Sequence, residues 1–177
     1  KTNSYIYKWR KYDVPQDYIR SVEDYTADNG FYFEVVRNQE AFVMNEPKTL
    51  VDEVSEVFSN YQTLQLKPQF IAMIPEGRVF EQGYVLSHDN RLLEELSMHQ
   101  SMSGTSYIPV DKTHDIFSTD IAIKPAEYID GRVLVLATPF AQGNYYHWMM
   151  ELIPRIEILQ ASNNALYDTI DFFYINS

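Results

Sequence analysis

Cysteine is absent from the 177 residues of this chain. Its absence excludes a disulfide framework, a zinc site with cysteine ligands and a cysteine nucleophile. A chain with a sizeable core and no cysteine suits a reducing compartment, so we expect a cytoplasmic location. The chain also lacks a run of about 18 apolar residues, and no transmembrane segment is therefore expected. The opening segment, KTNSYIYKWRKYD, has neither an apolar signal-peptide stretch nor an initiator methionine, so we expect the sequence to begin inside a longer chain.

Positive charge is scarce as well. Lys and Arg number 14 against 25 Asp and Glu, which gives a formal net charge of -11. General binding to nucleic acid or to an anionic membrane needs clustered basic side chains, so neither partner is expected. One local basic pocket for a phosphate group remains compatible with this balance. Hydrophobic residues make up 45% of the chain, which is typical of a globular domain.

Glycine-rich nucleotide motifs are also missing. The chain contains neither GxGxxG nor GxxxxGK[ST], so nothing local predicts a dinucleotide or ATP site. The GxSxG pattern of a nucleophilic serine is absent too. Function must therefore be sought in other side chains.

The first of two predicted regions, residues 1–67, is an amino-terminal extension without a clear functional motif. Hydrophobic spacing, a proline start signal and an Asn-Gly stop signal define its elements. These are a helix from Pro15 to Asp28, a strand over residues 31–36 and a second helix from Lys48 to Asn60.

The second region, residues 68–177, begins with short β-type runs separated by the turns PEG, EQG and HDN. This pattern predicts a β-meander or a pair of hairpins, with His88 in one of the turns. Residues 97–120 are rich in Ser and Thr and have no period, which predicts a long loop. His99 and His114 fall in that loop, and the sequence suggests no partner for either.

The last third of the chain has the clearest pattern. GRVLVLATP, residues 131–139, alternates little, as expected for a strand covered on both faces. Residues 144–162 follow with helical spacing, and residues 169–177 form another apolar run. Together they predict a βαβ unit of a parallel sheet and an α/β fold. Because such a sheet needs further units, we expect the chain to be cut short at its end.

The predicted helix carries two separate stripes. At about 100° per residue, four polar side chains fall within roughly 80° of arc. They begin where a strand ends, which is where open α/β sheets place ligand clefts. The polar stripe consists of Asn144, His147, Glu151 and Arg155, and the core stripe of Trp148, Leu152, Ile156 and Leu159.

His147 and Glu151 lie one helical turn apart. A carboxylate beside an imidazole fixes the ring orientation, as a general base or a phosphate-neutralising group requires. The alternative is a solvated pair that stabilises the helix by a few tenths of a kcal/mol. We expect no zinc, because HxxxE supplies two ligands at most.

The other two polar residues also allow two interpretations each. Asn144 is either a helix cap or a ligand donor at the positive end of the helix. Arg155 either binds phosphate or carboxylate, or forms a surface ion pair with Glu151. Between them, Pro154 removes a backbone hydrogen bond and clashes with the Met150 carbonyl, which predicts a kink.

Two segments resemble the amino-terminal half of glycosyltransferase family 61, whose bacterial members resemble polysaccharide biosynthesis proteins, including capsular ones. They are PQFIAMIPEGRVFEQGYVLSHDNRLLEELS and GRVLVLATPFAQGNYYHWMMELIPRIEILQ, and the resemblance covers residues 68–177. Family members commonly show N-x-x-H-W-x-x-(D or E)-x-x-P-R. The matching positions are Asn144, His147, Trp148, Glu151, Pro154 and Arg155.

The resemblance implies that a Rossmann-like βαβ unit follows the meander or hairpins, as the amino-terminal lobe of a two-lobed GT-B-type enzyme. It implies an inverting, metal-independent reaction that needs no cofactor and uses a nucleotide-sugar donor. This lobe would hold the glycan acceptor, and the missing carboxy-terminal lobe would supply most of the nucleotide site. His147 and Glu151 would be catalytic, and Asn144 and Arg155 would bind substrate. Competing hypotheses are a non-catalytic carbohydrate-binding or scaffold module and an unrelated Rossmann-like enzyme.

Overall fold

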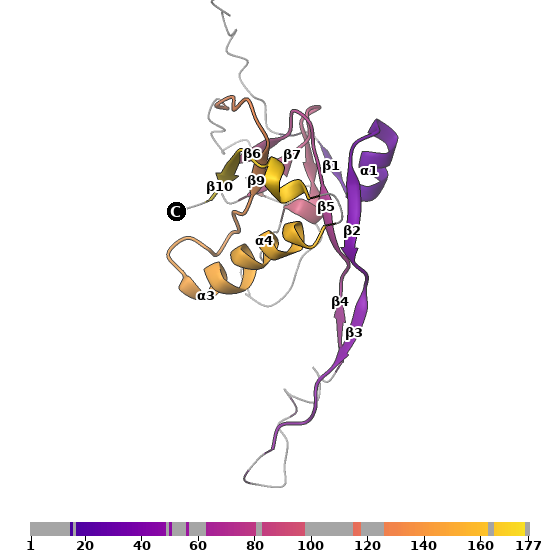
Figure 1. Ribbon diagram of the computed structural model, residues 1–177, viewed down its shortest axis with the longest axis vertical. Coiled ribbons are helices and arrows are strands. Elements are labelled where there is room, and N and C mark those ends of the chain that lie inside the picture. Colours follow the sequence, from indigo (N-terminus) through magenta and orange to yellow (C-terminus); the bar gives the residue numbers. More distant parts are fainter. Residues whose placement is uncertain are drawn as a thin grey trace, which may run out of the picture.

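The computed structural model describes residues 15, 17–48, 50, 56, 63–80, 83–97, 115–117, 126–162 and 165–175. These residues form a mixed α/β arrangement of several small sheets and few helices (Figure 1). The strands are β1 (Asp17–Ile19), β2 (Phe33–Arg37), β3 (Glu40–Val43), β4 (Thr63–Leu66), β5 (Gln69–Ala72), β6 (Arg78–Phe80), β7 (Tyr84–Leu86), β8 (Arg91–Leu93), β9 (Val133–Val135) and β10 (Phe172–Tyr174). The α-helices are α1 (Val22–Asn29), α3 (Tyr145–His147) and α4 (Ile153–Gln160), and short 3₁₀ turns span Glu94–Leu96, Asp115–Phe117 and Leu166–Thr169.

The first predicted helix begins later than expected. Its stop signal is confirmed, because Gly30 takes the left-handed conformation that caps α1, with φ 66°. The predicted start at Pro15 is wrong. Ser21 is the N-cap, and its hydroxyl accepts a hydrogen bond from the Asp24 amide at 3.1 Å. The preceding residues form β1 instead, because they pair in parallel with β8 and this tertiary pairing outweighs the local helical pattern.

The predicted meander is confirmed for three strands. β6, β7 and β8 are antiparallel neighbours, and β1 completes the sheet in the order β1-β8-β7-β6. The His88–Asn90 segment forms the turn between β7 and β8, as predicted. β5 does not join this sheet, since it pairs with β2. Strands from both sides of residue 67 therefore pair with each other, and the division into residues 1–67 and 68–177 stays a prediction.

A two-stranded ribbon projects from the body of the molecule (Figure 1). Its base is the β2–β5 pair and its outer part is the antiparallel β3–β4 pair. Every residue of the outer pair except the half-buried Leu64 is exposed, with Phe42 at 55% and Val43 at 67% exposure. Neither β3 nor β4 was predicted from the sequence. Most of the predicted helix from Lys48 to Asn60 and of the loop at 97–120 lies outside the described residues.

The predicted βαβ unit is present near the carboxyl end. β9 and β10 are parallel, with Val133 opposite Phe172, and the helical segment of α3 and α4 connects them. The Leu136 amide donates to the Tyr174 carbonyl at 3.0 Å and extends the pairing beyond β9. β9 is shorter than the predicted strand over 131–139, because the chain leaves the ladder after Leu136, and the residues that follow, Ala137 and Thr138, are buried.

The predicted core stripe of the helix is confirmed. A buried cluster centred on Leu152 contains residues from the segment after β9 and from the helix. Its buried members are Leu136, Ala141 and Leu152, and Leu134, Trp148 and Ile156 pack against it. No helix within the described ranges combines the length and the apolar character needed to cross a membrane.

Candidate functional site

The helix that carries the predicted polar stripe is divided by a π-helical turn. α3 is followed by the turn Trp148–Leu152, in which the Ile153 amide donates to the Trp148 carbonyl five residues back, and then by α4. Pro154 lies at the start of α4 and has no N–H to donate. The sequence predicted a disturbance at the Met150 carbonyl, and the wider turn spans that residue. π turns of this kind occur frequently at functional sites.

His147 and Glu151 are in contact. Nδ1 of His147 lies 2.6 Å from Oε1 of Glu151, a short distance typical of a hydrogen bond to an ionised group. The side chains are 24% and 27% exposed, so the pair is partly buried rather than fully solvated. Two aromatic rings flank the imidazole, with Phe140 at a centroid distance of 5.0 Å and Tyr146 edge-on at 5.3 Å.

A third residue completes the contact set of Glu151. The Thr138 hydroxyl donates to Oε2 of Glu151 at 3.0 Å, and Thr138 is fully buried. Thr138 comes from the segment just after β9, so it reaches the helix from the sheet. The sequence interpretation missed this residue. Its only signal was its place at the end of the predicted apolar strand, in a position where α/β sheets concentrate site residues.

Arg155 extends toward the sheet rather than into solvent. Its guanidinium donates from one terminal nitrogen to the Ala137 carbonyl at 3.1 Å and reaches the Val135 carbonyl at 3.5 Å. Burial lowers the pKa of Arg155, and the nearby negative charge of Glu151 acts in the opposite direction. The guanidinium therefore ties the helix to the chain that follows β9, next to Thr138.

Asn144 caps the helix, as one of its two interpretations predicted. Its side-chain oxygen accepts a hydrogen bond from the Tyr146 amide at 3.1 Å. Glu151, His147 and Arg155 therefore form one contiguous group with Thr138, whereas Asn144 stands at the exposed beginning of the helix.

The other described histidine, His88, is separate from this group. His88 places Nδ1 3.1 Å from the Tyr25 hydroxyl, and His99 and His114 lie outside the described residues. Near His88, a shallow hollow of about 290 Å³ is lined by residues of β1, the α1 segment and Arg91. None of the four sequence-predicted site residues lines it.

The contact with Glu151 gives the two ring nitrogens of His147 different roles. When Nδ1 carries the proton and donates to Glu151, the other ring nitrogen, Nε2, keeps its lone pair and can accept a proton. Within the ranges that the structure describes, no group of three or more His, Asp or Glu side chains is arranged to hold a metal ion. The site can therefore orient a base through a carboxylate and a buried hydroxyl.

Comparison of the chain with models of protein families, with curated proteins and with solved structures found no match.

Proposed function

We propose that this chain is the acceptor-side lobe of an inverting glycosyltransferase that uses a nucleotide-sugar donor in the synthesis of a polysaccharide or another glycan. The proposal joins the family 61 resemblance of the motif at 144–155 to the contacts among its side chains. The unit of β9, the helix and β10 would belong to a Rossmann-like lobe of a GT-B-type enzyme. A carboxy-terminal lobe of the same protein would bind most of the nucleotide, and the enzyme would act in the cytoplasm.

The observation that carries the proposal is the 2.6 Å contact between Nδ1 of His147 and Oε1 of Glu151. In the proposed reaction, Nε2 of His147 takes the proton of an acceptor hydroxyl as its oxygen attacks the anomeric carbon. The bond from that carbon to the nucleotide breaks, and the nucleoside diphosphate leaves with the bonding electron pair. Glu151 keeps the imidazole oriented and stabilises the imidazolium that forms.

Asn144 and Arg155 have supporting roles in this proposal. Asn144 would meet the acceptor at the exposed start of the helix. Arg155 would contribute positive charge to the same side of the site, although one of its terminal nitrogens already donates to two backbone carbonyls. No metal or other cofactor is proposed, so the nucleotide sugar and the glycan acceptor are the only small partners.

Release of nucleoside diphosphate by the full-length protein tests the proposal. A panel of nucleotide sugars is offered with glycan acceptors, with and without a metal chelator. We expect turnover with at least one donor, no loss of turnover on chelation and strong loss in His147→Ala. A folded wild-type protein that turns over no donor in the panel would contradict the transferase function.

A second candidate function, a non-catalytic carbohydrate-binding module, is favoured by two exposed aromatic side chains beside His147. Tyr145 is 78% and Tyr146 64% exposed, and such rings present flat apolar faces with a polar tip. Glycan binding without turnover by the full-length protein, lost in a Tyr145→Ala and Tyr146→Ala double variant, would favour this module over the enzyme.

A further inference from the structure

The carboxylate of Glu151 is held from two sides. Its Oε1 contacts Nδ1 of His147 at 2.6 Å, and its Oε2 accepts the hydroxyl hydrogen of Thr138 at 3.0 Å. One oxygen thus faces the imidazole while the other faces the sheet. A carboxylate with a single partner can rotate and expose either oxygen, whereas a second hydrogen bond at Oε2 fixes the plane of the group.

Thr138 is itself held in place by the chain around it. It is fully buried, and its carbonyl accepts the Ala141 amide at 3.3 Å. The preceding carbonyl, that of Ala137, accepts the guanidinium of Arg155 at 3.1 Å. The backbone that carries the hydroxyl is therefore tied to the helix one turn beyond Glu151. The Thr138 hydroxyl is thereby held in a fixed place, and it fixes the position of Oε2 of Glu151 relative to the sheet.

We propose that Thr138 is a positioning residue that selects the protonated nitrogen of His147. By fixing Glu151, the threonine hydroxyl favours the imidazole tautomer with hydrogen on Nδ1 and leaves Nε2 as the proton acceptor. The inference rests on the proposed function insofar as this nitrogen acts on a sugar acceptor. The hydrogen-bond geometry on which it depends exists whatever the substrate is.

Nitrogen-15 spectra of the histidine rings in the full-length protein measure the tautomer directly. They are recorded at about pH 8.5, two units above the ordinary histidine pKa of about 6.5, and His147→Gln identifies the signal. We expect the wild-type ring to carry hydrogen on Nδ1. In Thr138→Val the ratio of this tautomer to the Nε2–H form should fall about tenfold, the size expected for one hydrogen bond to a charged group.

Matched variants separate positioning from a merely structural role. Thr138→Ser keeps the hydroxyl and should restore the wild-type ratio. Thr138→Ala removes both the hydroxyl and the β-branching, and it should behave like Thr138→Val, which keeps the branching. Thr26→Val is the control, because Thr26 is also fully buried and its hydroxyl bonds to the Val22 carbonyl at 2.8 Å, on α1. That variant should leave the His147 spectrum unchanged.

Sugar transfer by the same proteins distinguishes the two proposals. We expect Thr138→Val to lower kcat about tenfold with little change in KM, and Thr138→Ser to recover it. If Thr138→Val and Thr138→Ala show the same tautomer ratio as the wild-type protein, the positioning role is overturned even if transfer is observed. If Thr138→Val shifts the tautomer ratio but the wild-type protein transfers no sugar, the glycosyltransferase function is overturned and the positioning role stands.

Discussion

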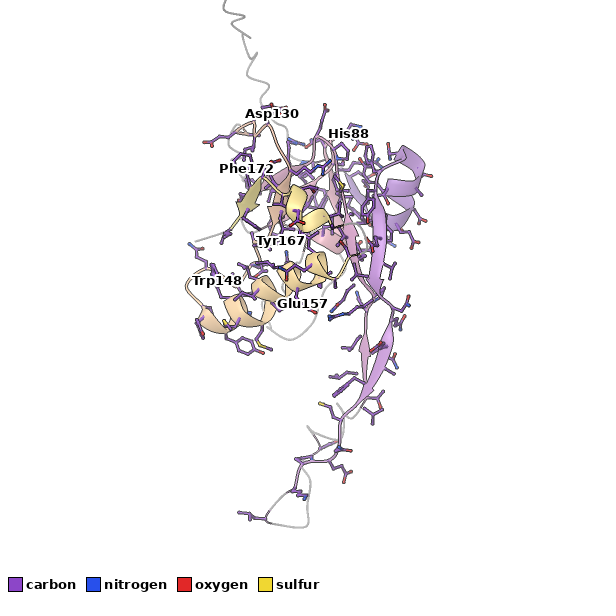
Figure 2. All side chains as sticks on the ribbon, in the orientation of Figure 1. His88, Asp130, Trp148, Glu157, Tyr167 and Phe172 are labelled. Atoms are coloured by element: carbon purple, nitrogen blue, oxygen red, sulfur yellow. The ribbon has the colours of Figure 1, made fainter. Side chains whose placement is uncertain are left out.

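His88 and His147 lie in separate regions of the molecule and use the same ring nitrogen for different partners. His147 contacts a carboxylate four residues away at 2.6 Å, whereas His88 contacts the neutral hydroxyl of Tyr25 at 3.1 Å, from a distant part of the sequence. Figure 2 shows His88 well apart from Trp148, the neighbour of His147. The charged contact orients its ring more strongly, because hydrogen bonds to ionised groups are about twice as strong as neutral ones.

The two sites also differ in the contacts that support them. Glu151 is held by the buried hydroxyl of Thr138, so the His147 group is backed by the sheet. The turn that carries His88 is supported by its own local contacts, an ion pair of 2.7 Å between Asp89 and Arg91 and a hydrogen bond from Ser87 to Asp89. The first arrangement is typical of a residue oriented for chemistry, and the second of a stabilised β-turn.

The largest expected difference between the two regions is in catalysis. His147→Ala should lower sugar transfer by about 10² to 10⁴-fold, the usual contribution of a general base. His88→Ala should leave it within about twofold, because His88 belongs to a different region. Initial rates of nucleoside diphosphate release measure both, and circular dichroism checks folding. Equal losses in the two variants would remove the functional distinction between the histidines.

A clash at the junction of the two regions should cost the most stability. Gly83 precedes β7 with φ 97°, and a Cβ built there lies 2.5 Å from the Ala137 carbonyl oxygen, next to Thr138. Gly83→Ala should lower the free energy of unfolding by about 3 kcal/mol, from backbone strain and overpacking together. Urea denaturation provides the measurement.

The control for that substitution is Gly143→Ala. Gly143 also has a positive φ, 69°, but a Cβ there meets no atom within 4 Å. It should lose only about 1 kcal/mol, from strain alone. If both alanine variants lose the same free energy, the close approach of Gly83 to Ala137 contributes nothing.

Removing the partner of His88 should have a smaller effect. Tyr25→Phe deletes one neutral hydrogen bond and keeps the ring packing, so the free energy of unfolding should fall by about 1 kcal/mol. Burial raises the pKa of Tyr25, so its hydroxyl stays neutral in this contact at pH 7. Urea denaturation measures the loss, and the nitrogen-15 signals of His147 should not move. A shift of those signals would show that the two regions are coupled.

The smallest expected effect is a change in acid stability. Burial raises the pKa of Asp89, but hydrogen bonds from Ser87 and Arg91 outweigh it, and the pKa lies below its ordinary value. The contribution of Asp89 to stability is therefore present above the unfolded pKa of about 3.9 and is lost as the pH falls through the lower folded value. Asp89→Asn should flatten this acid limb slightly, because the side chain is 39% exposed. Denaturation midpoints between about pH 2 and pH 5 test it, and identical limbs would contradict it.

Local spacing predicted the His147 site better than the elements that surround it. The contact of His147 with Glu151 follows from helical geometry alone, and so does the buried face around Leu152. Thr138 could not be found in this way, because its contact depends on how the segment after β9 meets the helix. The same spacing gave no sign that Pro154 is accommodated by a wider turn rather than by a simple kink.

The amino-terminal part was predicted less well for a similar reason. β1 takes its conformation from β8, and β5 takes its place from β2, so both depend on partners that are distant in sequence. The stop signal at Gly30 was found because a left-handed glycine cap is a local property. The outer ribbon of β3 and β4 has no buried residue, and the alternation of polar and apolar residues in β4 extends over only four positions.

The π turn at Trp148–Leu152 makes the number of residues in this helix important. Such a turn is equivalent to one amino acid added to a regular α-helix, so deletion of one residue there would restore an unbroken register and rotate one half by about 100° against the other. The imidazole of His147, before the turn, and the guanidinium of Arg155, after it, would then no longer lie on the same side of the helix. Relatives with a single-residue gap at this point would have lost the alignment of the two halves, even with every functional side chain retained.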